Sequence, residues 1–149
     1  PSLEELSESL FDKVVAVNLR GPFRLSAVIG ARMAAGEGGA IINVGSIEAI
    51  RPQPHALPYA AAKAGLHTLT EGFARAYGPK VRVNTIQAGA FLTDISTNWP
   101  EGLQEEMEPK IALARCAEPS EVVGTALYLA GSASSYTTGA AIRVDGGWA

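Results

Sequence analysis

The fold is decided by residues 40–86, which read AIINVGSIEAIRPQPHALPYAAAKAGLHTLTEGFARAYGPKVRVNTI. Ala40–Val44 is an apolar run that follows glycines, and this pattern predicts a buried strand. Tyr59–Tyr77 places apolar side chains at helical spacing and stops at Gly78-Pro79, which predicts a helix. Val81–Ile86 predicts a second strand. A strand, a helix and a strand in this order indicate parallel strands joined by a right-handed crossover.

The segment before this unit predicts a long helix. Apolar residues recur at helical spacing over about Leu6–Ala35. We expect a bend near Asn18–Pro22, because proline lacks a backbone donor and clashes with the preceding turn. The pattern Ser2-x-x-Glu5 is that of a capping box, so the sequence opens inside a helix start. We therefore expect that other residues precede this chain in its parent protein.

The segment after the unit continues the alternation. Gln87–Pro109 offers only short helical possibilities and is a candidate substrate loop, in which Trp99 and Met107 either line an apolar pocket or pack on the loop itself. A helix is expected from Glu118 to about Ala130, with proline and acids in its first turn. Ala140–Val144 predicts a third strand. The whole chain, residues 1–149, is therefore expected to be one α/β unit with three parallel strands and flanking helices.

Composition excludes several classes of protein. The chain is 47% hydrophobic and 18% charged, which argues against intrinsic disorder. No apolar run reaches the roughly 18 residues of a transmembrane helix, and the net charge of −3 does not favour nucleic acid or anionic membranes as partners. A single cysteine, Cys116, excludes an internal disulfide and fits a reducing compartment, so we expect a cytoplasmic protein.

The chemistry is concentrated in Tyr59-Ala-Ala-Ala-Lys63, where the two functional side chains lie on one helical face. An ammonium near a phenol favours the phenolate, so we expect Lys63 to lower the pKa of Tyr59 from about 10. A tyrosine tuned in this way can give a proton to an alkoxide or take one from an alcohol. Taken alone, the spacing also fits an ordinary exposed pair on a helix.

Two polar residues elsewhere strengthen the case. Ser46 follows the first predicted strand, and ligands bind at the carboxyl ends of parallel strands. Its hydroxyl can hydrogen-bond a substrate carbonyl and orient it toward Tyr59. Asn18 lies in the expected helix bend, where an amide can bond freed backbone groups and hold a water molecule.

Five segments together resemble the short-chain dehydrogenase/reductase family, in the family's order and spacing. They are Val17-Asn18-Leu19-Arg20-Gly21, Ile42-Asn43-Val44-Gly45-Ser46, Tyr59-Ala-Ala-Ala-Lys63, Val81-Arg82-Val83-Asn84-Thr85-Ile86 and Thr138–Gly147. The resemblance covers essentially the whole chain. It implies a Rossmann-like, doubly wound parallel sheet, of which this chain would hold the C-terminal portion. It also implies NAD or NADP as cofactor and a homo-oligomer, either a dimer or a tetramer.

The resemblance also implies a role for each matching residue. Tyr59 would be the acid/base, Lys63 would bind the nicotinamide ribose and tune Tyr59, and Ser46 would hold the substrate carbonyl. Asn18 would anchor a relay water. Tyr59 and Lys63 would also contact the cofactor, and three further residues would hold its nicotinamide end: Gly89, Phe91 and Thr93.

The chain departs from the family pattern in two places. Gln87-Ala88-Gly89 stands where the family usually has Pro-Gly, so the loop over the nicotinamide is expected to sit differently or to move more. The family's N-terminal, phosphate-binding half has no counterpart, because no glycine-rich turn here links a strand to a helix. Ala40–Val44 would normally pair with a further strand, so its edge is expected to be exposed.

The expected function is hydride transfer between NAD(P)(H) and a carbonyl or secondary alcohol. A 3-oxoacyl thioester is one candidate substrate, and sugars, polyols and steroid-like alcohols are others. The alternatives are a truncated, non-catalytic interaction subunit and, ranked lower, an epimerase or dehydratase. No metal site is expected, because His67 lacks a second ligand at metal spacing. His55 is either a plain loop residue or a substrate contact, and Cys116 is expected to serve packing.

Overall fold

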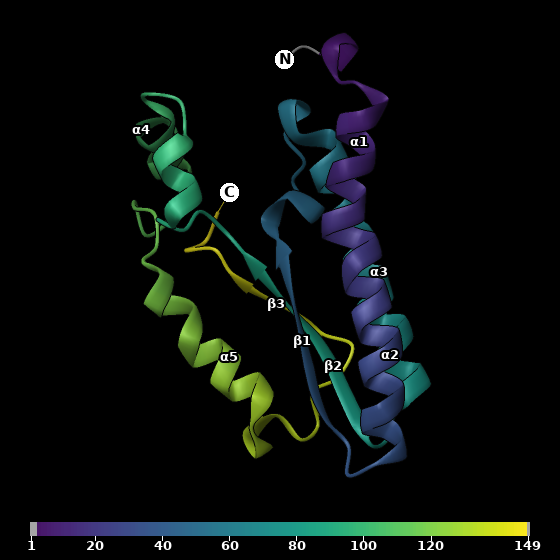
Figure 1. Cartoon of the computed structure of the whole chain (residues 1–149). Helices are drawn as coiled ribbons and strands as arrows, with labels where there is room; N and C mark the ends of the chain where they lie inside the picture. Colours follow the sequence, from purple (N-terminus) through teal and green to yellow (C-terminus); the bar gives the residue numbers. More distant parts are fainter. Residues whose placement is uncertain (1–2, 149) are drawn as a thin grey trace.

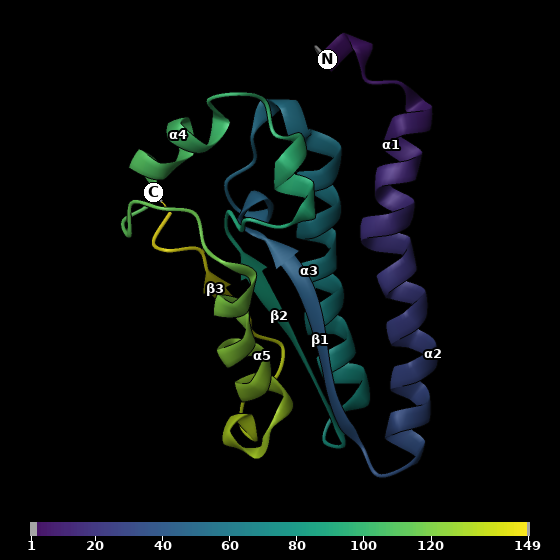
Figure 2. The same ribbon diagram turned by 60° about the vertical axis from the view of Figure 1, so that its left-hand side comes forward.

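The computed structural model describes residues 3–148, in which a three-stranded parallel sheet separates two layers of helices (Figures 1 and 2). The strands are β1 (Gly39–Ser46), β2 (Val81–Ala88) and β3 (Ala141–Val144), and they lie side by side in that order. The helices are α1 (Glu8–Val15), α2 (Gly21–Ala35), α3 (Leu57–Tyr77), α4 (Leu103–Met107) and α5 (Val123–Ala130). In both views α1, α2 and α3 lie on one side of the sheet and α5 on the other. The predicted α/β fold with parallel strands is confirmed.

The strand register brings the carboxyl ends of the strands together. Gly39 of β1 is opposite Val81 of β2, and the pairing runs to Ser46 opposite Ala88. Ala88 is in turn opposite Val144 of β3. Parallel strands bind ligands beyond their carboxyl ends, so this end of the sheet is the natural place for a site.

The predicted long N-terminal helix is present, but it begins two residues later than expected and contains one wider turn. Its start is Glu8 rather than Leu6, because the Ser7 hydroxyl caps it by accepting the Leu10 N–H at 3.2 Å. Ser2 of the expected capping box lies outside the described residues. At the expected bend, one wider π turn spans Ala16–Arg20 and joins α1 to α2. The Asn18 side-chain amide donates to the Val14 carbonyl of α1 at 3.0 Å, so it bonds the helix backbone just before this turn.

A buried polar contact fastens α3 to the sheet. The Thr70 hydroxyl accepts a hydrogen bond from the Asn43 amide of β1 at 2.8 Å. It also lies 2.8 Å from the Thr85 hydroxyl of β2, and all three side chains are buried. Near the C-terminal end of α3 the core continues with apolar contacts between Ala74, Val81 and Val83. The position of α3 relative to both strands is therefore fixed by directional bonds as well as by packing.

Within the described residues β1 lies at the edge of the sheet and pairs only with β2, as expected from the sequence. The Val44 side chain is 61% exposed, and apolar side chains of the neighbouring helix surface, Val17 and Leu25, are 72% and 62% exposed. Within residues 3–148, no helix is long and apolar enough to cross a membrane, and no cluster of three potential metal ligands occurs.

Candidate active site

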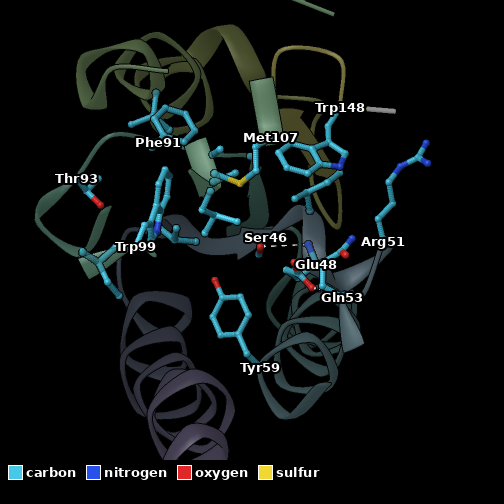
Figure 3. A pocket seen from close by; sticks show the side chains of 18 of the residues that line it. Ser46, Glu48, Arg51, Gln53, Tyr59, Phe91, Thr93, Trp99, Met107 and Trp148 are labelled. Atoms are coloured by element: carbon cyan, nitrogen blue, oxygen red, sulfur yellow. Dashed lines mark hydrogen bonds between the residues drawn. The ribbon is translucent and has the colours of Figure 1, made fainter. Parts of the chain in front are cut away.

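Ser46 and Tyr59 meet at the carboxyl end of β1. Ser46 is the last residue of that strand and is buried, whereas Tyr59 lies in the first turn of α3 and is half-buried. Figure 3 shows the Tyr59 hydroxyl pointing toward Ser46. The Ser46 oxygen accepts the backbone N–H of Glu48 at 3.2 Å. Its own proton can be donated to a second acceptor, either the Tyr59 oxygen, whose pKa Ser46 lowers, or a carbonyl oxygen.

Lys63 lies one turn after Tyr59 on the same face of α3. Its ammonium donates a hydrogen bond of 2.8 Å to the Val44 carbonyl and sits 5.4 Å from the centre of the Tyr59 ring. The predicted proximity of the tyrosine and the lysine is confirmed. Burial lowers the pKa of Lys63, because the protein interior solvates its charge less well than water does.

The expected direction of the Tyr59 pKa shift was wrong for this structure. Burial raises the pKa of Tyr59 above 10, the Ser46 hydroxyl acts in the opposite direction, and the negative charge of Glu48 raises it further. Desolvation of the phenolate is the dominant cause. The Lys63 ammonium lies 5.4 Å from the centre of the ring and donates its hydrogen bond to the Val44 carbonyl, not to the Tyr59 oxygen.

A cavity of about 480 Å³ opens beyond these residues at the carboxyl ends of β1 and β2. Ser46 and Tyr59 line it together with the three residues expected at the nicotinamide: Gly89, Phe91 and Thr93. Trp99 and Met107 also line it, which confirms the pocket interpretation of the long loop.

Asn18 is not part of this cavity. It lines a second cavity of about 460 Å³ between the α1–α2 helix and the edge of β1, and Lys63 lines that cavity too. Lys63 is therefore adjacent to Tyr59 on one side and shares a space with Asn18 on the other. Of the four expected catalytic residues, Ser46 and Tyr59 share one cavity, and Lys63 and Asn18 share another.

Ala88, which stands where the family usually has proline, is part of the sheet. β2 continues through Ala88, and the next residue, Gly89, donates its N–H to the Val144 carbonyl at 2.9 Å. Phe91 is then bridged to Ala117. The backbone that lines the cavity at this point is thus tied to two neighbouring segments.

The relatives of this chain settle its family. A family model described as enoyl-(acyl carrier protein) reductase matches residues 1–149. The chain is 36% identical to the 3-oxoacyl-[acyl-carrier-protein] reductase FabG of Thermotoga maritima, over 97% of this chain and 59% of that protein. The chain belongs to the short-chain dehydrogenase/reductase family. Within this family it is also 39% identical to the galactitol 2-dehydrogenase (L-tagatose-forming) of Cereibacter sphaeroides, over 97% of the chain and 59% of that protein.

Solved structures of the family share the fold described above. A gluconate 5-dehydrogenase from Burkholderia cenocepacia J2315, in complex with NADP and tartrate, superposes with a TM-score of 0.94 at 26% identity. The match covers 99% of this chain and 59% of that one. The Rossmann-like, doubly wound parallel sheet implied by the sequence resemblance is thereby confirmed. The chain spans about three fifths of the length of the relatives it matches.

Among the lining residues missed in the sequence are four with polar or aromatic side chains: Glu48, Arg51, Gln53 and Trp148. The first three fall in the proline-rich loop between β1 and α3, where side-chain direction cannot be inferred from periodicity. Trp148 follows β3 by only a few residues, and its carbonyl accepts a hydrogen bond from Arg143 at 3.1 Å. The single available signal was position, because Glu48 stands two residues after Ser46. His55, for which a substrate contact was one interpretation, also lines the cavity.

Proposed function

We propose that this chain carries the catalytic residues of an NAD(P)-dependent oxidoreductase that interconverts a carbonyl compound and a secondary alcohol. The observation that supports this most strongly is the Tyr59 hydroxyl facing Ser46 in an open cavity beyond parallel strands. Candidate substrates include 3-oxoacyl thioesters, sugars and polyols. We further propose a cytoplasmic homo-oligomer, supported by the single free Cys116 and by the family resemblance.

Tyr59 would move the proton and Ser46 would hold the substrate oxygen. In the reducing direction, the neutral phenol donates its proton to the oxygen as the carbonyl carbon receives a hydride. The Ser46 proton, which is not used in the bond from the Glu48 N–H, would donate to the same oxygen. In the oxidising direction, the phenolate takes the proton back as the alcohol carbon loses a hydride.

The cavity fits the nicotinamide end of the cofactor. Its floor is formed at the strand ends by Val44 and Ala88, and its wall by Gly89, Phe91 and Thr93. NAD(P), when bound, supplies the carbon that accepts or donates the hydride. Lys63 would contact the cofactor ribose and, in doing so, give up its bond to the Val44 carbonyl.

The cofactor phosphates would need residues outside these 149, because the sequence has no glycine-rich turn from a strand into a helix. We therefore propose that the chain is the C-terminal, catalytic part of one dinucleotide-binding domain. The exposed edge of β1 supports this proposal. The intact mass of the native protein tests it. A mass well above 15.5 kDa is expected, and a mass of 15.5 kDa would favour an interaction subunit instead.

The oxidoreductase proposal is tested by Tyr59→Phe in the native protein. We expect at least a roughly 100-fold loss of NAD(P)H oxidation over a panel of ketones, aldehydes and oxoacyl thioesters, because general acid catalysis is removed. Tyr77→Phe is the matched control, since Tyr77 bonds the Ala27 carbonyl away from the cavity. Equal rates in the wild type and Tyr59→Phe would refute the assigned mechanism.

A further inference from the structure

The polar part of the cavity wall is built around Glu48. Among residues 3–148, Glu48 is the only acidic residue that lines this cavity. Its Oε2 atom accepts the backbone N–H of Gln53 at 2.7 Å, so the carboxylate is held in place. No hydrogen bond to its Oε1 atom is found within the described part of the chain. A fixed carboxylate thus keeps one oxygen for a ligand.

The Glu48 carboxylate is not part of an ion pair among the described residues. Arg51 and His55 line the same cavity, yet neither forms an ion pair with Glu48 in the described residues. The charge of Glu48 reaches the Tyr59 hydroxyl, where it disfavours a second negative charge. Glu48 and Tyr59 line the same cavity, and Figure 3 shows both of them beside Ser46.

The opposite part of the wall is apolar. Figure 3 shows Glu48 and Gln53 on one side of Ser46, with Trp99 on the other and Met107 above. Ile95 and Leu103 extend the apolar lining. A substrate centred on Ser46 and Tyr59 would meet a hydrogen-bond acceptor on one side and apolar side chains on the other.

We infer that this site selects alcohols and ketones that carry a neutral hydroxyl on the carbon next to the reacting one and an apolar group on the other side. Glu48 accepts a hydrogen bond from that hydroxyl. A carboxylate in the same place is repelled, and a 3-oxoacyl thioester gains nothing, because its neighbouring carbon carries no donor. This inference rests on the proposed function for the position of the reacting carbon.

Intrinsic fluorescence offers a test that does not depend on turnover. The sequence contains two tryptophans, Trp99 and Trp148, and both line this cavity. Three probes share a phenyl group and a secondary alcohol and differ in one substituent: 1-phenyl-1,2-ethanediol, 1-phenylethanol and mandelate. Each is titrated against the native protein. We expect the diol to bind about tenfold more tightly than 1-phenylethanol, since hydrogen bonds to charged groups are the stronger ones, and mandelate to bind most weakly.

Two substitutions assign the preference to Glu48. Glu48→Leu should reduce the tenfold advantage of the diol to none, because the acceptor is removed. Glu48→Gln keeps an acceptor for the Gln53 N–H and removes the charge, so it should strengthen mandelate binding. Glu37→Gln, an exposed residue of the turn before β1, should change neither preference. Circular dichroism checks that each variant is folded.

Several results would overturn the inference. These are equal affinities of the wild type for the diol and 1-phenylethanol, tighter binding of mandelate, or no saturable change with any probe. Tighter binding of mandelate would assign selectivity to Arg51. Failure of the proposed function has a different signature, namely a normal diol preference in binding but no NAD(P)H oxidation with 2-hydroxyacetophenone.

Discussion

At the scale of single residues, the site depends on which protonation state burial favours. Tyr59 is half-buried, and burial together with the charge of Glu48 raises its pKa above 10. At neutral pH its phenol is therefore the neutral proton donor that carbonyl reduction needs. Alcohol oxidation needs the phenolate, so it should become faster as the pH rises.

The raised pKa of Tyr59 predicts a loss of stability in alkali. Above pH 10 the unfolded chain releases the Tyr59 proton while the folded chain still holds it, so the free energy of unfolding falls as pH rises through the folded pKa. We expect this fall to be steeper in the wild type than in Tyr59→Phe. Urea unfolding between pH 8 and about 11 measures it. An equally steep fall in both proteins would contradict the raised pKa.

The sequence was sufficient to bring Ser46, Tyr59 and Lys63 to one end of the sheet, because motif spacing and strand order determine that end. It was insufficient for the sign of the Tyr59 pKa shift. That sign depends on how much water the phenol loses and where the Lys63 ammonium points, and both are three-dimensional quantities. Glu48 was missed for the same reason, since it lies in an aperiodic loop.

At the scale of elements, the attachment of α3 to the sheet predicts that two threonines of this helix contribute differently to stability. Thr70→Val removes a buried hydroxyl and leaves the Asn43 amide without its acceptor. We expect a loss of about 1–3 kcal/mol in the free energy of unfolding. Thr68→Val is the control, because Thr68 is exposed on the same helix. Equal effects in urea unfolding would show that the network adds nothing.

In the short 3-10 helix that precedes α5, Pro119–Val122, we expect one carboxyl group to have a lowered pKa. The Arg115 guanidinium makes two 2.7 Å hydrogen bonds to Glu121, and the Glu118 N–H adds a third. These bonds lower the pKa of Glu121 to about 2. The stabilisation is present above the ordinary pKa of 4.5 and is lost as pH falls toward 2. In Arg115→Ala, an NMR titration should show the Glu121 pKa returning toward 4.5, and an unmoved value would contradict the pairing.

Element boundaries were predictable where apolar spacing or a cap marks them and not elsewhere. The three predicted strands are all present, and β1 and β2 each extend two residues beyond the predicted end. Proline and glycine marked the expected irregularity at Asn18–Pro22, but not its form. The π turn over Ala16–Arg20 leaves the helix continuous, and this depends on backbone bonding that composition does not encode.

At the scale of the whole molecule, the free edge of β1 predicts self-association of the 149-residue chain. An edge strand with an outward valine is a template for pairing with another strand. Val44→Lys should therefore reduce concentration-dependent association in analytical ultracentrifugation. Leu113→Lys is the matched control, because Leu113 is 64% exposed and Val44 is 61% exposed. If Val44→Lys instead unfolds the native protein, another segment covers this edge.

The buried hydrogen bonds of Thr70 hold α3 against the sheet at a point far from Tyr59. Tyr59 lies eleven residues before Thr70 along the helix, which is a distance of about 16 Å at 1.5 Å per residue. A tilt of about 4° around this fulcrum would carry Tyr59 by about 1 Å, a displacement that can cost an enzyme on the order of 100-fold in rate. The rigidity of the contact at Thr70 therefore limits how far the Tyr59 hydroxyl can move from the position that proton transfer needs.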